Sequence, residues 1–201
     1  NRKLLLNVTV LRSKDTFESY SHIDMLSLLN AHTMTLLIEY KLATKTTNRV
    51  NTYIIYIAGA SMKNRCWSEE NYGKLVSKMA IAYPNYKHII LKGVKEDEKF
   101  FDIYEPNKHL SNVIYQDALA LEQIYDYLAE ASLVIVGDTG IRNMAIATYT
   151  PTLGIFFGLT PYKYWPRDAK HDCIFKPDLS IPSVDEVYNS TIKLLDKIYG
   201  K

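Results

Sequence analysis

Residues 134–145 read VIVGDTGIRNMA, and a second apolar run, PTLGIFF, follows at residues 151–157. The letters VIV are typical of a buried strand and the letters GDTG of a tight turn. The letters IRNMA are typical of the start of a helix. Backbone N–H groups at a helix start lack partners within the helix and lie at the positive end of its dipole, so they attract phosphate. The stretch therefore predicts a strand–helix–strand unit whose turn holds a nucleotide diphosphate.

The same alternation of strand and helix extends from residue 53 to the C-terminus. Strands are expected at residues 53–58, 88–91, 112–115, 133–136, 152–157 and 173–175, and helices at 68–83, 96–104, 121–128, 141–148 and 183–199. Strands that alternate with helices indicate a parallel sheet that is covered on both faces. The fold class predicted is α/β, a Rossmann-like doubly wound parallel sheet of about six strands in the order 3-2-1-4-5-6.

The first fifty residues do not follow this pattern. Residues 3–11 are apolar enough for a strand, residues 24–40 are typical of a helix, and residues 41–52 are polar and resemble a linker. We therefore expect residues 1–50 to be the tail of a preceding domain or an interdomain extension, and residues 51–201 to form the α/β domain. The chain begins with Asn1, so we expect it to be a piece of something longer.

Composition excludes several classes of function. Of 201 residues, 47% are hydrophobic and 23% charged, and the formal net charge is +2, too small to indicate a nucleic-acid partner. Cys66 and Cys173 are isolated from each other and the five histidines are scattered, so no metal site is expected and a reducing cytoplasm suits the chain. No apolar run reaches membrane-spanning length.

Two loops have a chemical composition that suits phosphate. In the predicted strand order the first and fourth strands are neighbours, so the loops that follow them, residues 59–65 (GASMKNR) and 137–140 (GDTG), should converge. Each loop also has an ordinary interpretation, because an Asp-Thr pair before a helix is often a plain cap and exposed cations are often only solvated. Trp67 is expected to anchor the first loop by packing.

Three segments resemble the bacterial lipopolysaccharide heptosyltransferases. Residues 65–75, RCWSEENYGKL, resemble the family segment KrWpxexfxxL; residues 138–147, DTGIRNMAIA, resemble D-S/T-G-x-x-H-x-A-x-A; and residues 157–161, FGLTP, resemble fGpTxP. The segments occur in the family's order and spacing. The chain thus resembles the C-terminal, donor-binding half of a family nine glycosyltransferase, which has the GT-B fold, with an N-terminal extension.

The resemblance implies roles for residues that follow the first three strands. Ser61 and Arg65 would contact the donor phosphates, and an arginine in place of the family's usual lysine can bind them with two hydrogen bonds. Asp97 matches the acidic position that binds the adenosine ribose. Leu119 falls near the wall of the nucleobase site.

Roles are also implied for the GDTG turn. Thr139 and Gly140 would supply N–H groups to the diphosphate, and Asp138 would fix the turn or bind a hydroxyl of the donor sugar. Asn143 stands where the family has a histidine, and an amide can donate a hydrogen bond to phosphate but cannot become cationic. Arg142 is not a simple replacement, because adjacent helical residues point about 100° apart.

The function implied is transfer of a sugar, with heptose as a candidate, from a nucleotide-diphosphate sugar of the ADP type to a lipopolysaccharide or related glycan acceptor. No cofactor or metal is expected. Arg65 and Asp138 are the catalytic candidates on the leaving-group and donor-sugar side, while the general base would belong to the missing N-terminal domain. We therefore expect this fragment to bind nucleotide without turnover.

Two alternatives stay open from the sequence. One is a non-catalytic, degenerate nucleotide-sugar or scaffolding module. The other is a dinucleotide-dependent oxidoreductase, which the absence of a G-x-G-x-x-G sequence after the first strand disfavours. A cytoplasmic location is expected, and the segment 162–167, YKYWPR, is a candidate for peripheral contact with the inner membrane face, unless it only covers the site.

Overall fold

The computed structural model describes residues 52–60, 62–95, 97–158, 161–163, 165–166 and 169–200. The chain divides into two compact units, Asn1–Glu39 with Pro161–Pro166 and Tyr40–Thr160 with Arg167–Lys201. In the first unit the described part includes the short 3-10 helix η4, Pro161–Lys163. The strand expected at 3–11, the helix at 24–40, the boundary at residue 50 and part of the 162–167 segment lie outside the described residues.

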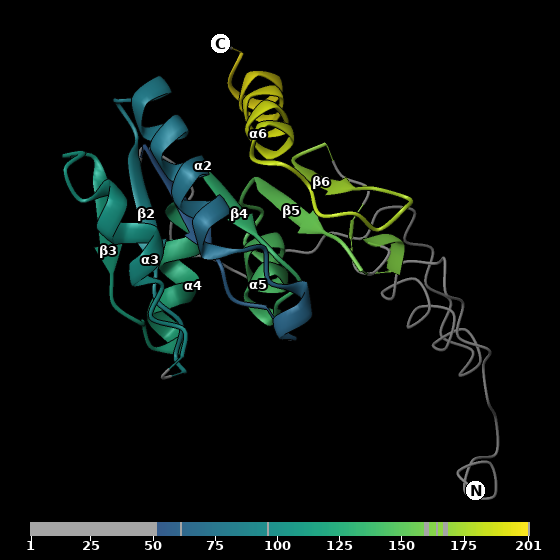
Figure 1. Ribbon diagram of the computed structural model, residues 1–201, viewed down its shortest axis with the longest axis horizontal. Coiled ribbons are helices and arrows are strands. Elements are labelled where there is room, and N and C mark those ends of the chain that lie inside the picture. Colours follow the sequence, from purple (N-terminus) through teal and green to yellow (C-terminus); the bar gives the residue numbers. More distant parts are fainter. Residues whose placement is uncertain are drawn as a thin grey trace, which may run out of the picture. The chain divides into compact units, whose positions relative to one another are not determined.

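The second unit is built on one six-stranded sheet, in which all neighbouring strands are parallel, and their order is β3-β2-β1-β4-β5-β6 (Figure 1). The strands are β1 (Tyr53–Ile57), β2 (Lys87–Leu91), β3 (Val113–Gln116), β4 (Leu133–Val136), β5 (Thr152–Phe156) and β6 (His171–Phe175). The predicted α/β fold class and the strand order 3-2-1-4-5-6 are confirmed.

Helices cover both faces of this sheet. They are α2 (Glu69–Ala82), α3 (Phe101–Tyr104), α4 (Leu121–Glu130), α5 (Gly140–Ala147) and α6 (Val184–Tyr199), with the 3-10 helices η2 (Lys63–Arg65) and η3 (Glu105–Asn107). Helices α2, α3 and α6 share one apolar cluster with the sheet, and α4 and α5 share the other. Figure 1 shows these two layers on either side of the strands.

Strand β1 shows why the sheet is buried on both sides. Its alternate residues Ile54 and Tyr56 belong to the cluster on the α2 side, whereas Ile55 and Ile57 belong to the cluster on the α4 side. Successive side chains of a strand point to opposite faces, so a continuous apolar run fills two cores at once. This burial holds the ends of β1 and β4, and hence their loops, in fixed positions.

Side-chain caps start the two longest helices where the sequence predicts them. The Ser68 hydroxyl accepts a hydrogen bond from the Asn71 N–H at 3.2 Å at the start of α2. At α6 the Ser183 hydroxyl accepts from the Glu186 N–H, while the Glu186 carboxylate accepts from the Ser183 N–H. This reciprocal pair is a capping box, and it lowers the pKa of Glu186 to about 2.

The helix expected at 96–104 is wrong in its first half. Residues 97–100 are not helical, and α3 begins only at Phe101. Phe100 has φ 55°, a left-handed conformation that interrupts a right-handed helix. The Glu98 carbonyl accepts from the Gly93 N–H at 2.9 Å, so the chain folds back toward the end of β2 before the helix starts.

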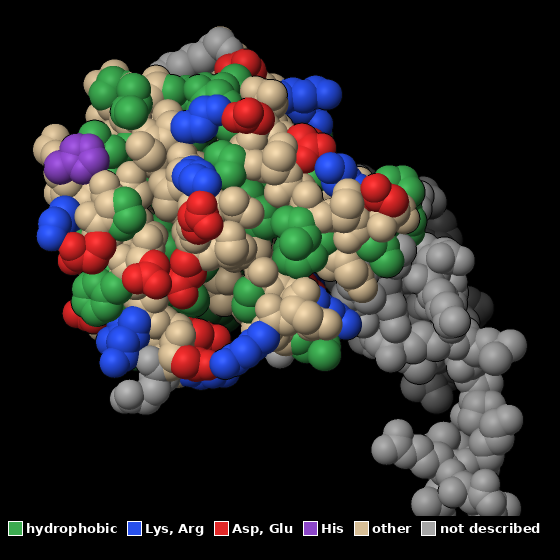
Figure 2. All heavy atoms as spheres, in the orientation of Figure 1, with side chains coloured by type: hydrophobic (Ala, Val, Ile, Leu, Met, Phe, Trp, Pro, Cys, Tyr) green, Lys and Arg blue, Asp and Glu red, His purple; other side chains and the backbone are tan. Residues whose placement is uncertain are grey.

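Charged side chains are distributed over the surface without separation by sign on the face shown in Figure 2, where basic and acidic groups alternate. Among the described residues, no helix is both long and apolar enough to cross a membrane.

His88 is a buried polar residue of β2 whose tautomer follows from its neighbours. Its Nε2 lies 3.2 Å from the Tyr83 carbonyl oxygen, and its Nδ1 lies 2.8 Å from the Tyr56 hydroxyl. A carbonyl can only accept, so Nε2 carries the hydrogen and Nδ1 accepts from Tyr56. Burial lowers the pKa of His88 to about 4, because it disfavours the charged ring.

The neutral His88 predicts a pH-dependent stability. His88 binds a proton near pH 6.5 in the unfolded chain but only near pH 4 in the folded chain. The free energy of unfolding should therefore fall as the pH drops between these values. The loss is at most about 3 kcal/mol from this residue. In urea unfolding at pH 7.5, 6 and 4.5, the free energy of unfolding should depend less on pH for His88→Gln than for the wild type. The exposed His109 supplies the control His109→Gln, which should keep the wild-type dependence.

Candidate functional site

The loop after β1 and the turn after β4 lie against each other. The two strands are direct neighbours, with Ile57 paired to Val136. A Cβ placed on Gly137 would lie 3.8 Å from the Gly59 carbonyl oxygen and 3.9 Å from that of Arg65. The expected convergence of the two loops is therefore confirmed.

One carboxylate joins these loops. Asp138 accepts from Arg65 Nη1 at 2.9 Å through Oδ2, and from Arg142 Nη1 at 2.8 Å through Oδ1. The Asp138 side chain is 15% exposed, that of Arg65 26% and that of Arg142 3%. Two guanidinium groups share one carboxylate, so this cluster keeps one formal positive charge at the start of α5.

The N-terminus of α5 adds backbone donors beside this charge. Thr139 is the N-cap and its side chain makes no capping hydrogen bond, while its N–H donates to the Gly137 carbonyl at 3.1 Å. A Cβ placed on Gly140 would meet no atom within 4 Å, so there is open space beside this first residue of α5. Because the Thr139 N–H already has an acceptor, Gly140 and Ile141 are the better placed donors to a ligand.

Arg142 is the residue that the sequence interpretation set aside. Its guanidinium lies over the Phe156 ring at 5.3 Å, and it also donates to the Asn143 side-chain oxygen. The available signal was the spacing of Asp138 and Arg142, because residues four apart along a helix start can pair. Asn143, the predicted ligand residue, is exposed.

A cavity of about 540 Å³ lies between the loops that follow β1 and β2. Its lining includes Lys63, Trp67, Lys95, Asp97 and Glu98. The predicted ribose ligand Asp97 is paired with Lys63 at 3.3 Å, and the Asp97 side chain is 58% exposed. Such an exposed pair holds Asp97 only weakly.

Glu98 is the more firmly held carboxylate of this cavity. Its side chain is 20% exposed and pairs with Lys95 at 3.1 Å. A Cβ on Gly93 would lie 2.2 Å from Glu98 Oε2, and one on Gly59 3.4 Å from Oε1. The carboxylate thus occupies space that glycines leave free at the ends of β2 and β1. The sequence resemblance pointed to its neighbour Asp97, because position alone does not reveal which carboxylate is buried.

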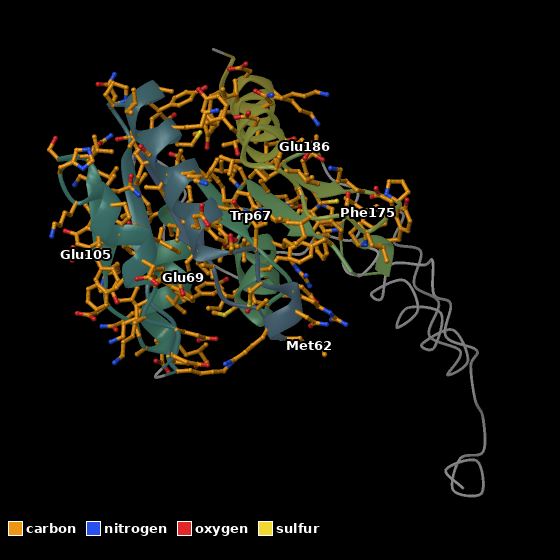
Figure 3. The ribbon with its side chains drawn as sticks, in the orientation of Figure 1. Met62, Trp67, Glu69, Glu105, Phe175 and Glu186 are labelled. Atoms are coloured by element: carbon orange, nitrogen blue, oxygen red, sulfur yellow. The ribbon has the colours of Figure 1, made fainter. Side chains whose placement is uncertain are left out.

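The remaining predicted residues have these places. Ser61 lies outside the described residues. Leu119 is half-buried and packs against the apolar cluster on the α4 side. Trp67 anchors the loop as expected, because its Nε1 donates to the Pro182 carbonyl at 2.8 Å and its ring meets the Tyr72 edge at 5.0 Å. Figure 3 shows Trp67 inside the fold and Met62 at the outer end of the loop.

Comparison with known proteins identifies the family. A sequence model described as glycosyltransferase family 9 (heptosyltransferase) matches residues 10–187. The chain belongs to glycosyltransferase family 9. No curated protein matches this family 9 chain.

Solved structures share its fold at low sequence identity. The E. coli heptosyltransferase WaaC with ADP superimposes with a TM-score of 0.77 at 14% identity, covering 95% of this chain and 61% of WaaC. A family 9 glycosyl transferase from Veillonella parvula gives 0.76 at 16% identity, covering 93% and 62%. The E. coli ADP-heptose lps heptosyltransferase II gives 0.76 at 16% identity, covering 98% and 68%. The family 9 chain thus spans about three fifths of the first of these proteins.

The shared carboxylate predicts a measurable effect on stability. Asp138→Ala leaves the buried Arg142 without this partner, and breaking such a pair costs about 3–5 kcal/mol. We expect the midpoint of urea unfolding to fall clearly. Arg142→Met should cost less, because it removes the buried charge and keeps an apolar chain on Phe156. Asp126→Ala, at an exposed carboxylate on α4, is the control. Equal midpoints for Asp138→Ala and Asp126→Ala would contradict the role of Asp138.

Proposed function

We propose that this chain binds the donor in a glycosyltransferase that transfers a sugar from a nucleotide-diphosphate sugar. An ADP-type donor is favoured, with heptose as the candidate sugar and a lipopolysaccharide or related cell-surface glycan as the acceptor. The observation that carries the proposal is the positive cluster of Arg65, Asp138 and Arg142 beside the open N-terminus of α5. The structure of WaaC with ADP supports the choice of nucleotide.

The chemistry follows from where charge develops. As the sugar leaves its nucleotide, the bond from the anomeric carbon to the diphosphate oxygen breaks and negative charge grows on the diphosphate. Fixed donors and cations lower the energy of that charge without rearranging. Arg65 supplies the partly exposed guanidinium, and the first N–H groups of α5 supply aligned dipoles. Asp138 would hold Arg65 in place and lie on the donor-sugar side.

The proposal includes metal-independent leaving-group stabilisation. The cations that would do this are the side chains of the cluster itself. Among the described residues no group of three or more His, Cys, Asp or Glu side chains is placed to hold a metal ion. The general base and the acceptor site would come from outside the donor-binding unit, so binding without turnover is expected from these 201 residues.

Calorimetric titration of the chain with ADP, UDP, GDP and NADH, without metal, tests the proposed ligand. ADP should bind most tightly, and Arg65→Ala should weaken ADP by about 10- to 100-fold, because a charged hydrogen bond is lost. Lys74→Ala removes an exposed cation on α2 that pairs with Glu70, and it should leave the affinity unchanged. Tighter binding of NADH than of ADP would favour the oxidoreductase alternative. Absence of nucleotide binding would favour a degenerate module.

Substitutions of the two cavity carboxylates should differ in their effect on ADP affinity, according to which one binds the ribose. A buried carboxylate can accept both ribose hydroxyls, and Glu98 is better held than Asp97. We expect Glu98→Gln to weaken ADP by about tenfold or more and Asp97→Asn by about threefold or less. Binding of 2′-deoxy-ADP should be less sensitive to Glu98→Gln than binding of ADP, because one of the two hydroxyls is absent. A larger effect of Asp97→Asn would instead assign the ribose to Asp97.

A further inference from the structure

Arg142 makes two kinds of contact that point in different directions. Its Nη1 donates to Asp138, while its Nε and Nη2 donate to Asn143 Oδ1 at 3.3 and 3.1 Å. The side chain is 3% exposed and its guanidinium lies on the Phe156 ring. A planar group held by a carboxylate, an amide oxygen and an aromatic face has little freedom to rotate. It is a rigid support at the start of α5.

This support fixes the orientation of the Asn143 amide. A guanidinium has only donors, so the atom of Asn143 that faces it must be the oxygen. The NH2 group therefore lies at the end of the amide that is turned away from the guanidinium. Asn143 as a whole is exposed.

Asn143 lies on the same side of α5 as Gly140, the first residue of the helix. Gly140 and Asn143 are three residues apart on α5, and residues at that spacing share one side of a helix. A Cβ added at Gly140 would meet no atom within 4 Å. An anion at the α5 N-terminus can thus accept from the backbone and from the Asn143 amide together.

We propose that Arg142 is a positioning residue, which holds the Asn143 amide so that its NH2 group donates to a diphosphate oxygen of the bound nucleotide. The inference rests on the proposed function for the identity of the ligand. Its own content is the chain of contacts from Asp138 through Arg142 to Asn143. The donor is set before the ligand arrives, so no rearrangement is needed on binding.

Asn143→Asp tests the orientation with an isosteric change. An aspartate still accepts from Arg142, and its second oxygen replaces the NH2 group with a negative charge. Affinities for inorganic pyrophosphate and for ADP should fall by about tenfold or more, while the unfolding temperature stays equal or rises. Asn189→Asp, at an exposed position on α6, adds the same charge elsewhere and should leave both affinities unchanged. Equal pyrophosphate affinity for wild type and Asn143→Asp would overturn the proposal.

Arg142→Lys tests the positioning role in two backgrounds. Lysine keeps the positive charge and can keep the ion pair with Asp138. It lacks the planar guanidinium that donates two hydrogen bonds to the Asn143 oxygen. The substitution should weaken pyrophosphate by about fivefold or more in the wild type and by less than about twofold in Asn143→Ala, since coupled residues are not additive. Equal effects in both backgrounds would overturn the role of Arg142. If Arg142→Lys fails to fold, the test is the NMR chemical shift of the Asn143 side-chain NH2 group in the wild type. A chemical shift that does not change when pyrophosphate is added would overturn the proposal.

These titrations separate the inference from the proposed function. A wild type that binds pyrophosphate but no nucleotide would refute the donor function and keep the anion site. A wild type that binds ADP, with Asn143→Asp binding it equally well, would keep the function and refute the inference. A wild type that binds neither ligand would refute both.

Discussion

The carboxylate of Asp138, shared between Arg65 and Arg142, is the interaction on which the site depends. It ties the loop after β1 to the turn after β4, and it lets two cations lie close together. The cluster still keeps a positive charge next to a helix N-terminus, where the dipole is also positive. The proposed diphosphate ligand would add negative charge at this positive end of the helix.

The sheet makes this arrangement possible. Strands β1 and β4 end side by side only because the order of strands reverses between them. Apolar side chains on both faces leave neither strand free to shift, and Trp67 ties the first loop to the Pro182 carbonyl. A rigid frame is needed because charge stabilisation decreases steeply when donors and cations move away from the ligand.

Most of the frame could be predicted from the sequence, since fully buried strands and capped helices carry local signals. The strand at 133–136, the Ser68 cap and the Ser183 capping box are examples. The first half of the helix expected at 96–104 is not helical, because the Gly93 N–H donates to the Glu98 carbonyl and bends the chain there. Helical periodicity does not reveal such a turn. The burial of Arg142 was missed because its partner Phe156 belongs to a different element, strand β5.

The choice of Asn143 has a consequence for the charge of the site. A histidine near the diphosphate would change its charge between about pH 5 and 8, whereas an amide does not titrate. The guanidinium groups of Arg65 and Arg142 stay charged at every physiological pH. In the proposed site the Asn143 amide therefore contributes a fixed dipole, whereas a histidine would contribute a charge that varies with pH.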